Sequence, residues 1–176
     1  GYGGSCFPKD GRALARTGRE YGSPMRIIEA VEAVNERQKE IVVRKLAAEL
    51  GDLRGRTVAL WGLAFKPETD DMREAPALVA IDRLTCAGAV VRVYDPAAMD
   101  ECRRRVGDAV VYCSDMYEAV VDADALVLLT EWKQFRLPSW TVIRKVMANP
   151  LVIDGRNIYD KAELVAEGFT YKAIGK

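Results

Sequence analysis

Six short runs of apolar and β-branched residues, separated by stretches with a helical pattern, occupy the chain from residue 55 onward. Continuous apolar runs indicate strands buried on both faces, and the intervening helices supply the crossovers that parallel strands need. The predicted strands are Thr57–Trp61, Val90–Tyr94, Val110–Tyr112, Ala125–Leu129, Leu151–Ile153 and Phe169–Lys172. The predicted helices lie near Ala75–Ala87, Met99–Val106, Asp115–Val121, Ser139–Ala148 and Lys161–Glu167. We therefore expect a doubly wound α/β domain with a parallel six-stranded sheet over residues 55–176.

The first 54 residues have a different pattern. A glycine-rich loop over residues 1–7 precedes a short helix that begins at Pro8 and ends near Tyr21. From Pro24 to Leu50, apolar residues recur at three- and four-residue steps, which predicts a single long helix that precedes the sheet. Such a helix of about 27 residues would be ~40 Å long, so we expect it to link domains or to form a homodimer interface. The predicted parts are residues 1–54 and 55–176.

Composition excludes several classes of function. The 26 basic residues balance the 26 acidic ones without a basic cluster, which argues against a nucleic-acid partner. Histidine is absent, so we expect neither imidazole catalysis nor a metal site. No apolar run approaches the ~18 residues of a membrane span, and no signal segment opens the chain. The balanced charge favours a small-molecule partner instead. The four cysteines form no C-x-x-C pair, which favours a reducing cytoplasm.

Ligands of doubly wound sheets bind outside the carboxyl ends of the strands. The loop after the first predicted strand starts with Gly62, but Ala64 and Pro67 replace the second and third glycines of the dinucleotide fingerprint. We therefore do not expect conventional NAD binding by this domain. Asp95 stands where a dinucleotide fold places its ribose-binding acid, and we interpret it here as a turn residue before Pro96.

Three cations, Lys66, Arg73 and Arg156, follow predicted strands and favour an anionic ligand at this edge. For the loop that holds Lys66 and Arg73, an ordinary solvated charged loop remains the alternative. Trp132 and Phe135 are candidates either for stacking on a ring or for covering the sheet edge.

Cys6 is the sharpest candidate in the N-terminal segment. It directly precedes a proline-initiated helix, where the helix dipole and Lys9 would favour a thiolate. Asp10 would lie one turn further on the same face, in reach of a group attached to the sulfur. A small buried cysteine in a turn remains the alternative for Cys6, and we interpret Cys86, Cys102 and Cys113 as packed residues without a chemical role.

Four segments together resemble the UDP-glucose/GDP-mannose dehydrogenase family. Gly1–Asp10 is similar to the family's active-site cysteine segment, and the others agree in the same order along the chain. These are Phe65–Pro67 continuing to Asp71–Glu74, Thr130–Trp132 and Asp154–Asn157. The resemblance implies a Rossmann-like UDP-binding domain at the C-terminal end of the family's chain. Since the family's N-terminal NAD domain has no counterpart here, we expect this C-terminal portion to be inactive alone.

The resemblance also implies roles for individual residues. In the family, the cysteine matching Cys6 is the nucleophile and the aspartate matching Asp10 assists the catalytic water. The residues matching Lys9 and Arg73 contact NAD, the cofactor. The implied reaction oxidises the primary alcohol of UDP-glucose to a carboxylate in two steps, through a thiohemiacetal and a thioester on the cysteine.

The implied substrate contacts come from Gly3, Phe65, Lys66 and Arg156, which match positions that hold the UDP-sugar. GDP-mannose and UDP-N-acetylhexosamines are the alternative substrates. The N-acetylhexosamine branch resembles a pattern with histidine before the cysteine, where this chain has Ser5. A non-catalytic nucleotide-binding module, in which Cys6 is incidental, is the alternative from another class.

Overall fold

The computed structural model describes residues 1–175 and contains a six-stranded sheet in the order β3-β2-β1-β4-β5-β6. All neighbouring strands pair in parallel. The strands are β1 (Thr57–Trp61), β2 (Val90–Tyr94), β3 (Val111–Tyr112), β4 (Ala125–Leu128), β5 (Leu151–Asp154) and β6 (Thr170–Ala173). The predicted doubly wound sheet is confirmed, with small shifts at the ends of four of the strands. The strand order reverses between β1 and β4, which is where such sheets bind ligands.

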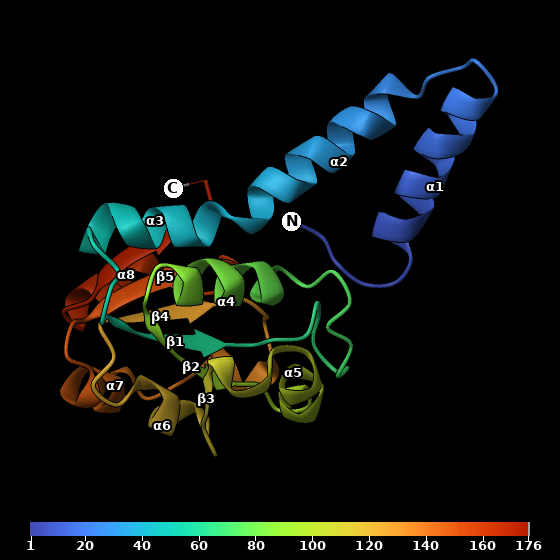
Figure 1. Ribbon diagram of the computed structural model, residues 1–176. Coiled ribbons are helices and arrows are strands. Elements are labelled where there is room, and N and C mark those ends of the chain that lie inside the picture. The colour runs from blue at the N-terminus through green and yellow to red at the C-terminus, as the bar shows by residue number, and fades with distance from the viewer. Residues whose placement is uncertain (176) are drawn as a thin grey trace.

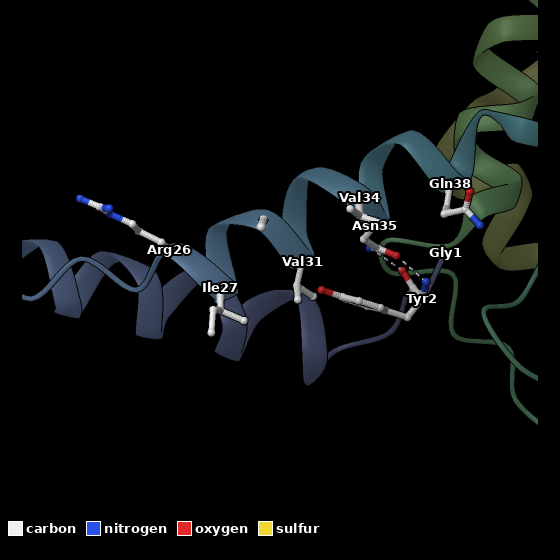
Figure 2. A pocket seen from close by; sticks show the side chains of 9 residues that line it. Gly1, Tyr2, Arg26, Ile27, Val31, Val34, Asn35 and Gln38 are labelled. Carbon is white, nitrogen blue, oxygen red and sulfur yellow. Dashed lines mark hydrogen bonds between the residues drawn. The ribbon is translucent and has the colours of Figure 1, made fainter.

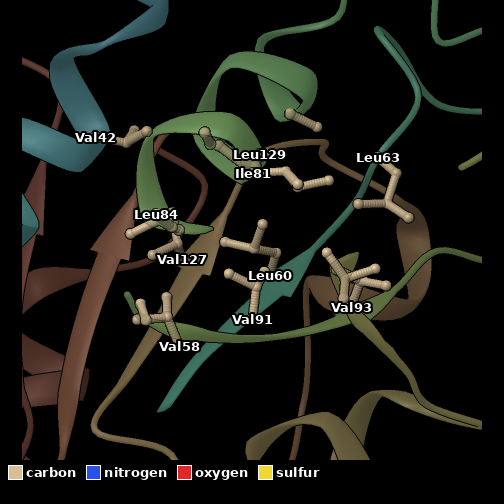
Figure 3. Close-up of a cluster of buried hydrophobic side chains, with 14 of the residues drawn as sticks. Val42, Val58, Leu60, Leu63, Ile81, Leu84, Val91, Val93, Val127 and Leu129 are labelled. Carbon is tan, nitrogen blue, oxygen red and sulfur yellow. The ribbon is translucent and has the colours of Figure 1, made fainter. Parts of the chain in front are cut away.

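Helices cover both faces of the sheet (Figure 1). They are α3 (Ile41–Leu50), α4 (Pro76–Cys86), α5 (Met99–Val106), α6 (Met116–Val120), α7 (Trp140–Val146) and α8 (Lys161–Ala166), with single turns η1 (Gly107–Ala109) and η2 (Lys133–Phe135). On one face Leu60, Val93 and Val127 pack against α3 and α4 (Figure 3). On the other, Trp61 and Leu128 pack with residues of α6, α7 and α8. The continuous apolar strands of the sequence are thus buried from both sides.

Two further helices, α1 (Phe7–Glu20) and α2 (Arg26–Lys39), form a hairpin that projects away from the sheet (Figure 1). Residues 1–39 are called the arm below. Arg12 of α1 lies 3.5 Å from Glu32 of α2, and Arg19 lies 3.5 Å from Glu29, so ion pairs contribute to holding the two helices together. Within residues 1–175, no helix has the length and apolarity to cross a bilayer.

The single helix expected over Pro24–Leu50 is bent, which corrects the prediction. α2 ends at Lys39 and α3 begins at Ile41, with Glu40 between them in a turn. The Glu40 carboxylate accepts a hydrogen bond of 2.7 Å from Arg83 of α4. Because α3 lies along the sheet while α2 leaves it, the chain changes direction where this tertiary contact holds it.

Candidate functional site

The cysteine loop (residues 1–6) packs against the β1 loop (residues 62–75), which follows the central strand. The amide of Gly4 donates a hydrogen bond of 2.7 Å to the Arg73 carbonyl oxygen. A Cβ at Gly3 would lie 2.5 Å from the Glu74 carbonyl oxygen, and one at Gly4 would lie 2.8 Å from the Phe65 ring. Both positions therefore need glycine, because any side chain would force the two loops apart.

Cys6 occupies the N-cap position of α1 and is exposed. Its carbonyl oxygen accepts the Asp10 amide at 2.8 Å, which forms the first turn that the sequence predicts. The Asp10 carboxylate lies 3.4 Å from the Lys9 ammonium, and both side chains are mostly exposed. The Cys6 sulfur lies 3.6 Å from the Ser5 hydroxyl oxygen. The thiol is thus open to a ligand at the N-terminus of a helix, and the alternative of a buried turn cysteine does not apply.

Lys9 and Arg73 line one cavity of about 470 Å³, together with Arg12 and Arg105. The Arg73 guanidinium donates hydrogen bonds to the Asp71 carboxylate, of 2.8 Å from Nη2 and 3.0 Å from Nε. This pairing lowers the pKa of the Asp71 carboxyl. Arg105 comes from α5, and nothing in the sequence connected it with the cysteine. Glu74 lines the same cavity, and each of the four cations is also paired with a carboxylate. Arginine and lysine side chains at such a place can still contact an anionic group such as a phosphate.

Phe65 is the meeting point of the predicted substrate residues. Its ring lies against Gly4, and the Lys66 ammonium lies 5.4 Å from the ring centroid, within range of a cation–π contact. Lys66 itself is exposed, so its charge remains available to a ligand. The carbonyl oxygen of Phe65 accepts a hydrogen bond of 3.0 Å from Arg156. Phe65 thus joins Gly3 and Gly4 of the cysteine loop to both predicted cationic contacts.

Arg156 bridges three loops at the carboxyl edge of the sheet. Besides Phe65, its guanidinium contacts the Leu129 carbonyl oxygen at 2.7 Å and the Glu131 carboxylate at 3.0 Å. Its side chain is only one quarter exposed. The buried carboxylate of Asp154 accepts the Arg156 amide at 2.9 Å and so fixes the turn that carries the guanidinium. Arg156 therefore organises the loops as well as placing a charge at the predicted site.

Asp95 is a turn residue as predicted, and it does more than the sequence indicated. Its buried carboxylate accepts five hydrogen bonds, from the amides of Leu63, Ala64, Ala97 and Ala98 and from the Trp132 indole. A carboxylate engaged by five donors has no capacity left for a ribose. The carboxylate therefore serves to hold the turn, and this use agrees with an interpretation of Asp95 as a turn residue.

The two aromatic candidates, Trp132 and Phe135, have different positions in the structure. Trp132 lies over the sheet edge, where its indole donates to Asp95 at 3.1 Å. Phe135 is fully buried and stacks on Trp61, with ring centroids 5.1 Å apart. Phe135 is consequently a core residue, and its ring is not accessible to a ligand.

The other cysteines have no place in the site. Cys102 and Cys113 are buried as predicted, and burial raises the pKa of the Cys102 thiol to about 11. Cys86 is exposed at the end of α4, contrary to the prediction, because the apolar pattern of this helix faces the sheet on its other side. Among residues 1–175, no group of three or more acidic or cysteine side chains is arranged to bind a metal ion.

A doubly wound sheet with an exposed cysteine and several cations near its switch-point edge has the architecture of nucleotide-binding α/β proteins. Comparison with known families identifies its kind. The model of the UDP-glucose/GDP-mannose dehydrogenase family, UDP binding domain, matches residues 59–161, and that of the family's central domain matches residues 1–37. The chain belongs to the UDP-glucose/GDP-mannose dehydrogenase family.

Individual relatives agree with this assignment. The chain is 51% identical to a UDP-glucose 6-dehydrogenase of Pseudomonas aeruginosa, over all of this chain and 40% of that protein. A UDP-glucose dehydrogenase structure from Pyrobaculum islandicum has a TM-score of 0.85 at 37% identity, over 98% of this chain and 37% of that one. A GDP-mannose dehydrogenase structure from Pseudomonas aeruginosa has a TM-score of 0.71 at 26% identity, over 87% of this chain and 36% of that one. The chain thus spans about 40% of the length of the curated relatives it matches.

Proposed function

We propose that the chain supplies the catalytic cysteine and the UDP-sugar site of an NAD-dependent UDP-glucose 6-dehydrogenase. One observation carries the proposal: the cysteine loop packs directly on the β1 loop, with Gly3 and Gly4 in contact with Glu74 and Phe65. A nucleophile and an anion-binding edge that lie far apart in the sequence therefore form one continuous site. The names of the relatives support UDP-glucose as its substrate.

Cys6 is the proposed nucleophile. Its sulfur attacks the carbon of the aldehyde formed in the first oxidation, and the resulting thiohemiacetal cannot escape before the second. Loss of a hydride from that carbon, with loss of the hydroxyl proton, turns the thiohemiacetal into a thioester. Water then attacks the thioester carbon and the C–S bond breaks, which releases the carboxylate and the thiol. Asp10, one turn from the sulfur, is the proposed base that accepts the water proton.

NAD is the proposed cofactor, and its nicotinamide supplies the hydride acceptor when bound. Lys9 and Arg73 are the proposed contacts of this chain with NAD, since both line the cationic cavity beside Cys6. Asp95 is fully engaged within the sheet domain and takes no part in holding it. Two side contacts do not offset the several kcal/mol of freedom lost on association, so a separate domain must bind NAD.

UDP-glucose is held, in this proposal, by Lys66 and Arg156 on either side of Phe65, with Gly3 close to the sugar. The cationic groups supply the charge-assisted contacts that a diphosphate needs. GDP-mannose is the competing substrate. The higher identity and TM-score of the UDP-glucose relatives favour UDP-glucose over it.

A homodimer through α2 is a further part of the proposal. Ile27, Val31 and Val34 form an apolar stripe along α2, with Ile27 80% exposed. The stripe borders a groove of about 610 Å³, in which the Tyr2 side chain extends alongside α2 toward Val31 (Figure 2). Exposed apolar side chains at helical spacing suit packing against the same stripe of a second copy.

Alkylation of Cys6 tests the proposed site in this chain. Iodoacetamide should label Cys6 faster than free cysteine, and UDP-glucose should slow the labelling by covering the site. The matched background is a Cys86→Ser variant, which removes the other exposed thiol. Labelling no faster than free cysteine and insensitive to UDP-glucose would favour the non-catalytic module. Stronger protection by GDP-mannose than by UDP-glucose would reassign the substrate.

A further inference from the structure

Glu74 connects three parts of the molecule that meet beside the cysteine. Its carboxylate binds Arg12 of α1 through both oxygens, at 2.8 and 3.0 Å, and also lies 3.1 Å from the Lys39 ammonium of α2. Glu74 itself belongs to the β1 loop. One carboxylate of the sheet domain is therefore bound to both helices of the arm.

Lys39 makes this contact in a buried setting. Its side chain is only 2% exposed, and its ammonium pairs with Glu36 at 2.9 Å as well as with Glu74. A buried ammonium is tolerated only where carboxylates compensate its charge. Lys39 therefore holds Glu74 in place more firmly than an exposed ion pair would.

The backbone of Glu74 is also part of the contact with the cysteine loop. Its carbonyl oxygen lies where a side chain at Gly3 would be, and the preceding carbonyl, of Arg73, accepts the buried Gly4 amide. Glu74 has a φ of 55°, a left-handed conformation that is unfavourable for a residue with a side chain. Such a conformation persists where the surrounding contacts enforce it, and it often marks a functional position.

The cysteine loop has a second attachment on its other side. The amide of Tyr2 donates to Asn35 of α2 at 2.6 Å, and the Asn35 side chain donates back to the Tyr2 carbonyl oxygen at 3.1 Å. The Tyr2 hydroxyl also donates a hydrogen bond of 2.7 Å to the Glu32 carboxylate. The cysteine loop is thus attached to α2 on one side and to the β1 loop on the other. The Glu74 carboxylate, through Lys39, connects the β1 loop to α2.

We propose that Glu74 is a positioning residue that fixes the Cys6 loop relative to the loop bearing Phe65, Lys66 and Arg73. The inference rests on the proposed function for its catalytic consequence, but its structural part stands on the contacts alone. Glu74 touches neither the thiol nor the predicted substrate residues by its carboxylate, and it acts through Arg12, Lys39 and its own backbone.

Amide exchange at Gly4 tests the structural part in this chain. Glu74→Gln keeps the length of the side chain but removes the charge that binds Arg12 and Lys39. We expect the Gly4 amide to exchange roughly tenfold faster, because its hydrogen bond to Arg73 opens more often. Glu101→Gln is the matched control, since Glu101 also binds two arginines but only within its own helix. An unchanged Gly4 rate in Glu74→Gln would overturn the proposal.

Arg12→Gln is a second variant that keeps the proposal testable if Glu74→Gln does not fold. It removes the link from Glu74 to α1, together with the pairs of Arg12 with Glu32 and Glu36 of α2, and should also accelerate Gly4 exchange. The double variant should add less than the sum of the two effects, because the Arg12–Glu74 pair is shared. Fully additive effects would mean that Arg12 and Glu74 act on the loop separately, which contradicts the proposal.

The catalytic part is tested in a protein that joins this chain to an NAD-binding domain. Glu74→Gln should lower kcat for UDP-glucose oxidation while KM for UDP-glucose stays within about twofold, because the UDP contacts lie in the sheet domain. A rise in KM with kcat unchanged would overturn the positioning role. Absence of oxidation in the unsubstituted protein would refute the proposed function, and Gly4 exchange would still decide the role of Glu74.

Discussion

The sheet domain and the arm are held by different forces. Within residues 1–175, both core clusters consist of residues from the sheet, its covering helices and their loops, and neither includes a residue of α1 or α2. The arm leaves Phe7, Tyr21 and Ile27 more than 70% exposed and meets the sheet domain through hydrogen bonds and the ion pairs of Glu74. Burial of apolar surface is a far larger stabilising term than partly exposed ion pairs. The proposed nucleophile and Gly3 therefore lie on the weakly anchored arm, and the other proposed substrate contacts, Phe65, Lys66 and Arg156, lie on the more stable sheet domain.

Leu60→Ala should produce the largest difference between the two regions. Leu60 is fully buried in the central strand, so its truncation should lower the free energy of unfolding by about 2–5 kcal/mol. Ile27→Ala on the arm should change it by less than about 0.5 kcal/mol in dilute monomer. Urea denaturation followed by tryptophan fluorescence measures both.

The same pair of variants examines the proposed dimer. Sedimentation at higher concentration should show a dimer that Ile27→Ala weakens and Leu60→Ala leaves assembled as long as the chain is folded. A monomer at all concentrations would contradict the interface on α2. A large loss of stability for Ile27→Ala in dilute monomer would contradict the comparison itself.

Lys66→Ala and Arg156→Ala should each weaken UDP-glucose binding by roughly tenfold to a hundredfold, as expected for a charge-assisted contact of about 1.5–3 kcal/mol. They should differ in stability. Lys66 is exposed and contacts only the Phe65 ring, whereas Arg156 joins three loops. Calorimetric titration and thermal unfolding together should therefore show a pure binding defect for Lys66→Ala and a lower Tm in addition for Arg156→Ala. Equal Tm values would show that the loop contacts of Arg156 carry no stability.

The smallest expected effect is a difference in pH response. The guanidinium of Arg12 holds the pKa of Glu74 at about 2, below its ordinary value of 4.5. Because this pKa is lowered on folding, the stabilisation is present above pH 4.5 and is lost as the pH falls toward 2. Besides Arg12, the groups facing Glu74 are Lys39 and, through these cations, Glu32 and Glu36 of α2.

The sheet domain should respond in the opposite direction. Burial raises the pKa of Cys102 from 9.0 to about 11 and that of Tyr112 from 10.0 to about 12. Their stabilisation is complete below pH 9 and is lost as the pH rises through these values. Protection of the Gly4 amide, relative to its intrinsic exchange rate at each pH, should therefore fall first in acid, and tryptophan fluorescence should report unfolding first in alkali. Simultaneous loss of both signals at either extreme would show that the two regions unfold as one unit.

The sheet was predictable because strands that are buried on both faces consist of continuous apolar residues. The bend at Glu40 was not, since Val34 and Ile41 lie two helical turns apart on the same face and neither proline nor glycine stands between them. At the bend, Glu40 contacts Arg83 from a helix more than forty positions further along. Local periodicity contains no information about such a contact.

The site was predictable to the extent that it rests on residue type and motif. The sequence indicated that Cys6 begins a helix and that Lys66, Arg73 and Arg156 reach one edge of the sheet. Glu74 was not distinguished from the other acids of a charged loop, because its role depends on Lys39 and Arg12 arriving from distant helices. The prediction that Cys86 is packed was wrong for a related reason. Apolar neighbours in the sequence do not show which side of a helix faces the core.

The five hydrogen bonds to Asp95 bear on any attempt to engineer a dinucleotide site into this domain. If the carboxylate were freed to bind a ribose, four loop amides and an indole N–H would lose their acceptor. Unpaired donors are costly when they are buried. Restoring glycines alone would leave Asp95 occupied. Gly62 also lies so close to Thr130 that the turn has no room to open outward. A redesign toward NAD would have to replace the turn, the acid and the facing loop together, and each change made singly would weaken the fold before any affinity was gained.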